Sequence, residues 1–451
     1  MPLINRCGGG GSSFAAVIQV TYNSGAVCTC ANGSTTLTAP DTSGSVNFKV
    51  KRKGTWTITV ELGGRAKTKA VSITTDGQIE SLEVFSSKIY GISRDITNSS
   101  PEWARTDNAV GFTATASVGT AAGSSSFDNC YPWSGIVRET LSTGDVMVKI
   151  PKFWYRRFRS GNIEHIQIAD APTPNFELHP AFNHAGEAKD YLYVGAYKTS
   201  SNNKSVSGAV PTAQTDMDTA RSKATSKGTG WGLMDISTLS AIQMLILVEF
   251  ANNNVQLAIG KGYASNNPMG SINVCNTGTC DNVPRLTGSL ATSPSDVVWR
   301  GIEGFWGNLY EFVDGVLGGP GGKYYVCNNP SQYTSQALTG YTECSYGTGV
   351  AVQGGTFFSE FITQEGLDIN NSYVIMPSST VGQGSSTTYE CDTFGSSSYS
   401  DSDGIPVFRG GNKGYENGSN GLFCTVAHAQ PSRYTSDIGS RLIYIPQEAA
   451  S

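Results

Sequence analysis

The sequence has few charged residues and lacks any long apolar run. Asp, Glu, Lys and Arg together make up 15% of the 451 residues, and the formal net charge is -5 at pH 7. No basic cluster indicates electrostatic binding to a nucleic-acid backbone, so nucleic acid is not expected as a partner. No apolar stretch is long enough for a signal peptide or a membrane span, so we expect no membrane insertion and, if the protein is exposed, release by a route other than secretion.

Cysteine is also scarce, with 10 residues scattered along the chain. This number is too small for a disulfide scaffold of this length. Cys28 and Cys30 share one face of an expected strand, whereas Cys275 and Cys280 bracket a turn. Zinc would need two such pairs with further Cys or His in register, and the sequence offers none. We expect buried thiols or one loop disulfide, and neither a metal nor a cofactor.

Glycine, serine, threonine and asparagine are abundant, with 53 glycines alone. Such a composition is typical of a β-rich and loop-rich extracellular or particle-surface protein rather than a helical enzyme. The length allows two or three domains and a large core. The tetrapeptide at 401–404, DSDG, resembles a fragment of a calcium loop but lacks the downstream Glu, so a plain turn is expected.

The N-terminal part divides into a leader and a small β domain. Residues 1–15 contain a glycine run with no packing capacity and are expected to be flexible. Residues 16–85 alternate apolar and polar side chains between turns at short intervals, which predicts a small β-sandwich. Its pattern resembles immunoglobulin-like or carboxypeptidase-regulatory-like spacer modules. Residues 86–135 are irregular and are expected to form a connection, with a second domain over 136–448.

Two helices are expected in the second domain. The first runs from about Thr215 to Ser226, with Thr215 as its N-cap. The second covers residues 235–254, where Asp235 or Ser237 can cap a wide apolar stripe. Glu249 near its end could be catalytic, but an exposed or carbonyl-bonded carboxylate is the favoured interpretation. The aromatic strand around 153–158 could form a cation–π cage, although core packing is favoured there too.

The most specific text lies in three motifs, FWGN at 305–308, FRGG at 408–411 and GSRL at 439–442. Together with the upstream order of IPKFWYRR, HPAF and a capped helix, they resemble the C-type-lectin fold in its formylglycine-generating-enzyme-like branch. The resemblance covers residues 88–446 and is typical of phage tail-fibre or head-fibre proteins. It implies an α+β architecture in which the β-sandwich precedes a lectin-type domain with two helices and many short strands.

Five residues of these motifs have a scaffold role in this interpretation. Trp306 supplies aromatic core, Gly307 lets the backbone pass close to the indole, and Asn308 bonds neighbouring backbone groups. Arg409 and Arg441 are flanked by core-like residues and are expected to lie partly buried against Glu303, Glu311 or Asp314. None of the five is expected to be catalytic.

An enzymatic function was considered and is not favoured. The oxidases of this branch carry two reactive cysteines shortly after the RGG strand, where copper binds, whereas this chain has only Cys424 there. The spaced pair Cys275 and Cys280 lies before the FWGN motif, in the wrong part of the fold. Cys424 with His428 could be drawn as nucleophile and base, but no orienting carboxylate follows. We therefore expect no enzyme.

A binding function explains the segment between FRGG and GSRL better. In phage members of the fold this segment forms the ligand-facing surface, and in retroelement-diversified members it is the variable region. A strand over 422–430 would place alternate residues, from Leu422 to Gln430, on one recognition face. The candidate ligand-binding residues are Lys413, Tyr415, Glu416, Asn420, Cys424, Val426, His428, Gln430, Arg433 and Tyr434.

The resemblance implies a virion protein made in the bacterial host cytoplasm. It predicts a homotrimeric receptor-binding fibre protein whose N-terminal region contacts other virion proteins and whose lectin-type surface binds a host glycan or protein. A structural decoration protein, with the same segment buried between protomers or left as a ligand-free loop, is the alternative. Diversification that mutates adenines in Asn-type codons cannot produce Lys413, Glu416 or Gln430. Whether the segment is actively diversified therefore stays open.

Overall fold

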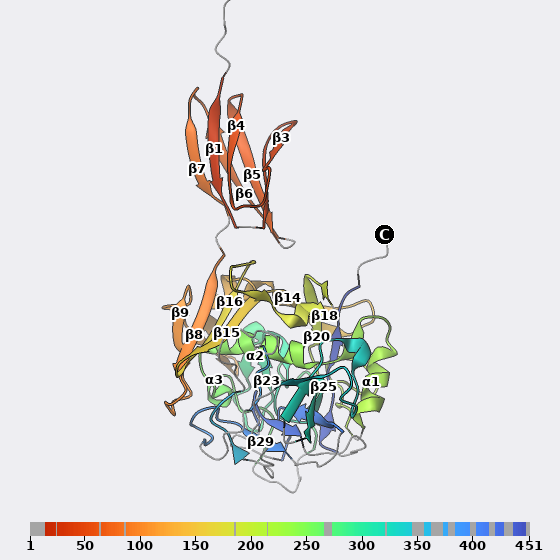
Figure 1. The fold of residues 1–451 in the computed structure, drawn as a ribbon. Coiled ribbons are helices and arrows are strands. Elements are labelled where there is room, and N and C mark those ends of the chain that lie inside the picture. The colour runs from red at the N-terminus through yellow and green to blue at the C-terminus, as the bar shows by residue number, and fades with distance from the viewer. Residues whose placement is uncertain are drawn as a thin grey trace, which may run out of the picture. The chain divides into compact units, whose positions relative to one another are not determined.

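The computed structural model describes residues 14–23, 25–62, 65–84, 87–184, 186–213, 215–265, 273–320, 323–344, 356–361, 373–377, 384–396, 403–414, 420–427 and 436–447. Within these ranges the chain forms mostly strands and few helices (Figure 1). It divides into two compact units, residues 1–88 with 171–176 and residues 89–170 with 177–451, each described by itself below. No helix in these ranges combines the length and apolar character needed to cross a bilayer.

The first unit consists of two sheets around one core. One sheet has the order β4-β1-β7 and the other β3-β2-β5-β6. The strands are β1 (Ala16–Thr21), β2 (Val27–Asn32), β3 (Thr35–Thr38), β4 (Ser45–Val50), β5 (Gly54–Leu62), β6 (Arg65–Ile73) and β7 (Ile79–Glu83). Alternate residues of β5 face inward, with Trp56, Ile58 and Val60 buried beside Cys28 and Cys30. The expected two-faced strands are present, whereas the immunoglobulin-like class stays a prediction.

The N-terminal part of the second unit is more ordered than the sequence indicated. A five-stranded sheet has the order β17-β15-β16-β8-β9. Its strands are β8 (Ile89–Asp95), β9 (Ala104–Asp107), β15 (Trp154–Ser160), β16 (Ile163–Ala169) and β17 (Glu177–Leu178). The expectation of an irregular connection over 86–135 is therefore wrong for 89–107, because β8 pairs along its whole length with β16. Phe153, Trp154 and Tyr155 are buried, as core packing requires.

Further sheets complete the second unit. One has the order β13-β14-β20-β33-β21, another β11-β22-β23-β24, and the largest β27-β26-β25-β30-β31-β29-β28 with β32 beside β25, while β10-β12 and β18-β19 form two short pairs. These strands are β10 (Ala114–Thr115), β11 (Ser117–Val118), β12 (Ser124–Ser125), β13 (Val137–Thr140), β14 (Val146–Pro151), β18 (Asn183–His184), β19 (Glu187–Ala188), β20 (Tyr191–Gly195), β21 (Trp231–Leu233), β22 (Gly288–Ser289), β23 (Val297–Trp299), β24 (Ile302–Glu303), β25 (Tyr310–Gly319), β26 (Lys323–Val326), β27 (Thr342–Cys344), β28 (Thr356–Phe357), β29 (Thr393–Ser396), β30 (Ile405–Arg409), β31 (Thr425–Ala427), β32 (Ile438–Gly439) and β33 (Leu442–Tyr444). This β-rich architecture is compatible with a C-type-lectin-like fold.

The central helix is α2 (Ile236–Phe250), which is capped by Asp235 as expected. Every residue from Ile236 to Glu249 is buried, so this part of the helix has no solvent-exposed face. The expectation of a single apolar stripe is incomplete, because α2 packs against β8 and β16 as well as β25 (Figure 1). A helix that is apolar on most of its circumference is stable only inside a core.

Glu249 is neither exposed nor bonded to a carbonyl, contrary to the favoured interpretation. Its carboxylate is fully buried and lies 2.6 Å from Arg300 Nη2. It also accepts hydrogen bonds from Trp299 Nε1 at 2.9 Å and Ser125 Oγ at 2.8 Å. The carboxylate is thus fully engaged in joining the helix end to neighbouring loops.

Two shorter helices flank α2. Helix α1 (Met217–Thr225) begins later than expected, because Asp216 rather than Thr215 accepts the capping hydrogen bond from the backbone of Thr219. Helix α3 (Val255–Ala258) follows the end of α2. Thus both longer helices were predicted from the sequence, whereas the N-cap of α1 lies one residue after the expected position.

Candidate functional site

The three motifs of the C-terminal region meet in one sheet. Strand β25 follows FWGN, and its Glu311 lies opposite Arg409 of β30. Strand β32 runs parallel to β25 on its other side and places Gly439 beside Glu311. Residues separated by about a hundred positions are therefore brought to a single carboxylate.

Glu311 is the centre of a buried ionic cluster. Its side chain lies 2.8 Å from Arg409 Nη2, 2.7 Å from Arg441 Nη2 and 2.8 Å from Lys198 Nζ. All four side chains are at most 3% exposed. Burial alone would raise the pKa of Glu311, but the three cations outweigh it and hold the pKa at about 2. Both arginines thus pair with one of the three carboxylates that the sequence offered, and they are fully rather than partly buried.

Most of the remaining donors of the two arginines bind backbone carbonyls, whereas Arg409 Nε has no hydrogen-bond partner among the described residues. Arg409 Nη1 donates to the carbonyl of Phe305 at 2.6 Å, and its guanidinium lies 3.6 Å from the centre of that ring. Arg441 Nη1 donates to the carbonyl of Gly195 at 2.7 Å. Buried charges with this many hydrogen bonds fix geometry, and they cost stability when one partner is lost.

Backbone contacts hold the FWGN loop, and those of Asn308 were predicted from the sequence. Trp306 Nε1 donates to the carbonyl of Gly260 at 2.9 Å. Gly307 has a φ of +81°, and a Cβ there would lie 2.6 Å from the backbone nitrogen of Tyr263. Asn308 forms paired hydrogen bonds, both 2.9 Å, with the backbone of Cys275. Only glycine satisfies both constraints at position 307.

The two ends of the candidate binding segment lie together. Asn412 Nδ2 donates to Asp437 Oδ2 at 3.1 Å, and the backbone nitrogen of Tyr310 donates to the carbonyl of Asp437 at 2.9 Å. The nitrogen of Lys413 donates to the carbonyl of Asn308 at 2.9 Å. The segment from 413 to 436 therefore leaves and re-enters the same rigid frame.

The middle of this segment is buried, so the expected recognition face is wrong for residues 420–427. Strand β31 covers only Thr425–Ala427, and every residue from Asn420 to Ala427 is buried. Three candidate ligand-binding residues lie here, and Asn420, Cys424 and Val426 are 0%, 1% and 8% exposed. The alternation argument is wrong for 422–427 because residues on both faces are buried, with Phe423 and Ala427 as inaccessible as Leu422 and Cys424.

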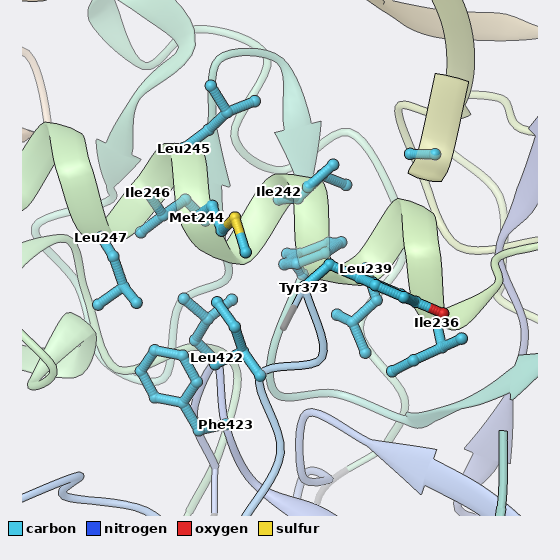
Figure 2. Close-up of a cluster of buried hydrophobic side chains, with 14 of the residues drawn as sticks. Ile236, Leu239, Ile242, Met244, Leu245, Ile246, Leu247, Tyr373, Leu422 and Phe423 are labelled. Carbon is cyan, nitrogen blue, oxygen red and sulfur yellow. The ribbon is translucent and has the colours of Figure 1, made fainter. Parts of the chain in front are cut away.

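Residues 420–427 are anchored beneath helix α2. Figure 2 shows Leu422 and Phe423 under the helix, and Gln243 Nε2 of the helix donates to the carbonyl of Leu422 at 3.2 Å. The backbone nitrogen of Phe423 donates to Asp392 Oδ2 at 2.8 Å. Asp392 is 1% exposed, and burial raises its pKa to about 7. This part of the segment therefore serves as an anchor rather than as a displayed surface.

The other candidate ligand-binding residues have different positions. Lys413, at the start of the segment, lies within the described residues and is half-buried. The remaining six, Tyr415, Glu416, His428, Gln430, Arg433 and Tyr434, lie outside the described residues, as do 1–13 of the leader and the first two residues of the DSDG turn.

Two residues that hold the framework were not predicted from the sequence, Lys198 and Asp392. A lysine closing the apolar run YLYVGAYK was a signal for the first, and the sequence carried none for the second.

The cysteines offer no redox centre among the described residues. All nine cysteines in these ranges are free, and burial raises the pKa of the Cys424 thiol well above its usual range. Burial likewise raises the pKa of Cys275 to about 12. No group of three or more His, Cys, Asp or Glu side chains that could hold a metal occurs in the described part of the chain. Thiolate chemistry would need a lowered pKa, which neither Cys424 nor Cys275 has.

Comparison with known proteins gives little further. No known family and no curated protein matches the sequence. Similar solved chains include the Major Tropism Determinant I1 variant, at 12% identity over 88% of this chain and 82% of that chain, with a TM-score of 0.25. The P3c variant is similar at 11% identity over the same shares, also with a TM-score of 0.25. A TM-score of this size assigns neither fold nor function.

Proposed function

We propose that the chain is a phage virion receptor-binding protein of a tail or head fibre, without enzymatic activity. The proposal rests on the motif resemblance and on one structural observation, the closed frame around the 413–436 segment. The frame is held by buried contacts of Glu311, Arg409 and Arg441 and by the link between Asn412 and Asp437. None of these contacts uses a side chain of 415–419 or 428–435. We therefore expect the frame to tolerate substitutions in those two stretches.

The proposed contact surface is narrower than the sequence indicated. Residues 420–427 anchor the segment, so we assign binding to Lys413, Tyr415, Glu416, His428, Gln430, Arg433 and Tyr434. Tyr and Arg are the residue types that dominate binding hot spots. The ligand would be a host-surface glycan or protein, and a homotrimer would add avidity to weak single sites. The first unit would act as a spacer toward other virion proteins.

Binding of the full chain to host cells tests this function. The test variant carries Ala at Tyr415, His428, Arg433 and Tyr434, and the control variant carries Ala at Val110, Val118, Val210 and Leu257, which are exposed. We expect the test variant to lose at least about tenfold in affinity, since one hot-spot residue contributes ~2 kcal/mol. Equal binding by both variants would contradict the assignment of the surface.

The structural decoration alternative makes a different prediction. If the 413–436 segment were buried between protomers, the same four substitutions would change the oligomeric state. The wild-type protein itself would then not bind cells. Sedimentation of both variants separates the two functions. A reverse-transcriptase gene beside a near-copy of the 413–436 coding segment would support active diversification.

A further inference from the structure

A second polar region, lined by residues outside the 413–436 segment, encloses a cavity of about 200 Å³. Helix α1, strand β21 and the β18–β19 hairpin border it, with the chain after β33. Its walls combine apolar side chains with charged ones, and the apolar part includes Trp231, Leu233, Ile443 and Ile445. At ~30 Å³ per water molecule, the space equals roughly six or seven waters. A cavity of this size suits a small organic molecule.

The polar end of the cavity contains a histidine with an unused nitrogen. His184 is 7% exposed, and its Nε2 lies 3.0 Å from Asp235 Oδ2. Because a carboxylate only accepts, Nε2 carries the proton, and a neutral ring then presents a lone pair at Nδ1. Burial, the largest influence, lowers the pKa of His184, which keeps the ring neutral. Nδ1 is buried and has no hydrogen-bond partner among the described residues.

The other polar groups at this end are also mainly acceptors. Asp235 accepts hydrogen bonds from the Thr238 backbone at 2.7 Å and from Tyr333 Oη at 3.1 Å. Tyr333 thus donates its only proton and presents oxygen lone pairs. A buried acceptor left without a donor costs ~1–3 kcal/mol. A ligand that supplies N–H or O–H groups would remove that cost.

The charges at this end leave a negative excess. Asp235 and Asp314 are fully buried, and one guanidinium faces them, Arg221, whose Nη2 lies 2.6 Å from Asp314. Glu187 and Lys189 at the rim pair with each other at 3.1 Å. Burial raises the pKa of Asp314 to about 6, so that the group is charged at pH 7.5. Two buried carboxylates with one cation favour a positively charged ligand.

Space for the ligand is left by a residue without a side chain. Gly232 borders the cavity, and a Cβ built there would have only Ile443 Cγ1 within 4 Å, at 3.8 Å. Its backbone is not in the left-handed region, so a larger residue is sterically allowed. Neighbouring Gly230 differs, because its Cβ would lie 2.2 Å from the carbonyl of Ile445. Glycine is therefore required by the backbone at 230, whereas at 232 its effect is to keep the cavity open.

We infer that this cavity binds the primary ammonium group of a small ligand whose remaining part is apolar. The three N–H donors would reach acceptors at His184, Tyr333 and the carboxylates, while the apolar part would contact Trp231 and Ile443. The inference does not depend on receptor binding by the 413–436 segment. It applies equally to a free amine and to a lysine side chain of another protein.

Calorimetric titration of the full chain at pH 7.5 with three matched probes tests the inference. Benzylamine, benzyl alcohol and benzoate have nearly the same shape but carry positive, zero and negative charge. We expect benzylamine to bind at least about tenfold tighter than the alcohol, with no binding of benzoate. Nα-acetyl-lysine amide, titrated in the same way, distinguishes a lysine side chain from a free amine. Equal affinity for amine and alcohol, or no amine binding up to about 10 mM, would overturn the inference.

Substitutions of Gly232 locate the binding. Gly232→Leu fills the space and should weaken benzylamine by at least about tenfold, and Gly232→Ala should have a smaller effect. The control Leu257→Ala, at an exposed residue that does not border the cavity, should bind as the wild type does. Should Gly232→Leu fail to fold, Gly232→Ala and His184→Phe provide the same comparison. Wild-type affinity in folded cavity variants would mean that the amine binds elsewhere.

Discussion

Two buried polar regions of the second unit differ in how completely they are closed. Around Glu311, one carboxylate meets three cations, and the remaining donors reach backbone carbonyls except for Arg409 Nε, which has no partner in the described ranges. Around Asp235, two carboxylates meet one guanidinium, and a histidine nitrogen has no partner in the described ranges. The first region has the features of a frame, whereas the second retains the space and the unsatisfied acceptor that a ligand requires. Burial of charge alone therefore does not distinguish a scaffold from a site.

The largest effect is expected at the closed region. Glu311→Gln removes the charge of the carboxylate that pairs with Arg409, Arg441 and Lys198, so three buried cations lose this partner. Loss of one partner of a buried pair costs ~3–5 kcal/mol. Urea unfolding measures the loss. The control Glu343→Gln breaks a half-exposed pair with Lys323 and should change stability by less than ~1 kcal/mol. Similar losses in both variants would show that the Glu311 cluster is not a frame.

The apolar anchor of the candidate segment gives the next effect. Leu422→Ala creates a cavity beneath α2 and should lower stability by ~3 kcal/mol. Leu257, which is 79% exposed, provides the matched control, and its replacement by Ala should change stability by less than ~0.5 kcal/mol. Denaturant unfolding of the two variants is the measurement. If Leu422→Ala were as mild as Leu257→Ala, residues 420–427 would not anchor the segment.

A pH-dependent effect is expected at Asp392, which holds the same anchor. Burial raises its folded-state pKa to about 7, above the value of ~3.9 in an unfolded chain. The folded state therefore binds more protons between these values, and stability falls as pH rises through that window. Asp392→Asn cannot titrate and still accepts from Phe423, so its stability relative to the wild type should rise by ~2 kcal/mol from pH 5.5 to pH 8. The measurement is unfolding of the wild type, Asp392→Asn and the exposed control Glu102→Gln across this pH range. Parallel changes in the stability of all three proteins would contradict the assignment of the raised pKa to Asp392.

The smallest effect is expected at the open region. Gly232→Leu adds apolar atoms to an existing space, with Ile443 as the nearest neighbour. Its stability should stay within ~1 kcal/mol of the wild type, because cavity filling offsets local strain. Denaturant unfolding measures this change, and a loss of ~3 kcal/mol would show that the region is as tightly packed as the Glu311 frame.

Several features could be predicted from local sequence because neighbouring residues decide them. The alternation in 54–62 and the capped apolar run after Asp235 each reflect a local backbone or period requirement. The candidate site was predicted less well. A strand period assigns alternate residues to two faces, but it cannot say whether other parts of the chain cover each face, so Cys424 and Val426 were predicted to lie on a surface.

Local sequence set the two longer helices, the alternating strands within residues 16–85 and the motifs that bear the two arginines. Only the tertiary structure decided that Glu311 is the carboxylate they share, that Glu249 is buried, and that 420–427 lies under α2. It also brought His184, Asp235, Arg221 and Gly232 around one cavity. The physical reason is that period and capping are set within a few residues, whereas burial and charge pairing depend on residues far apart in the chain.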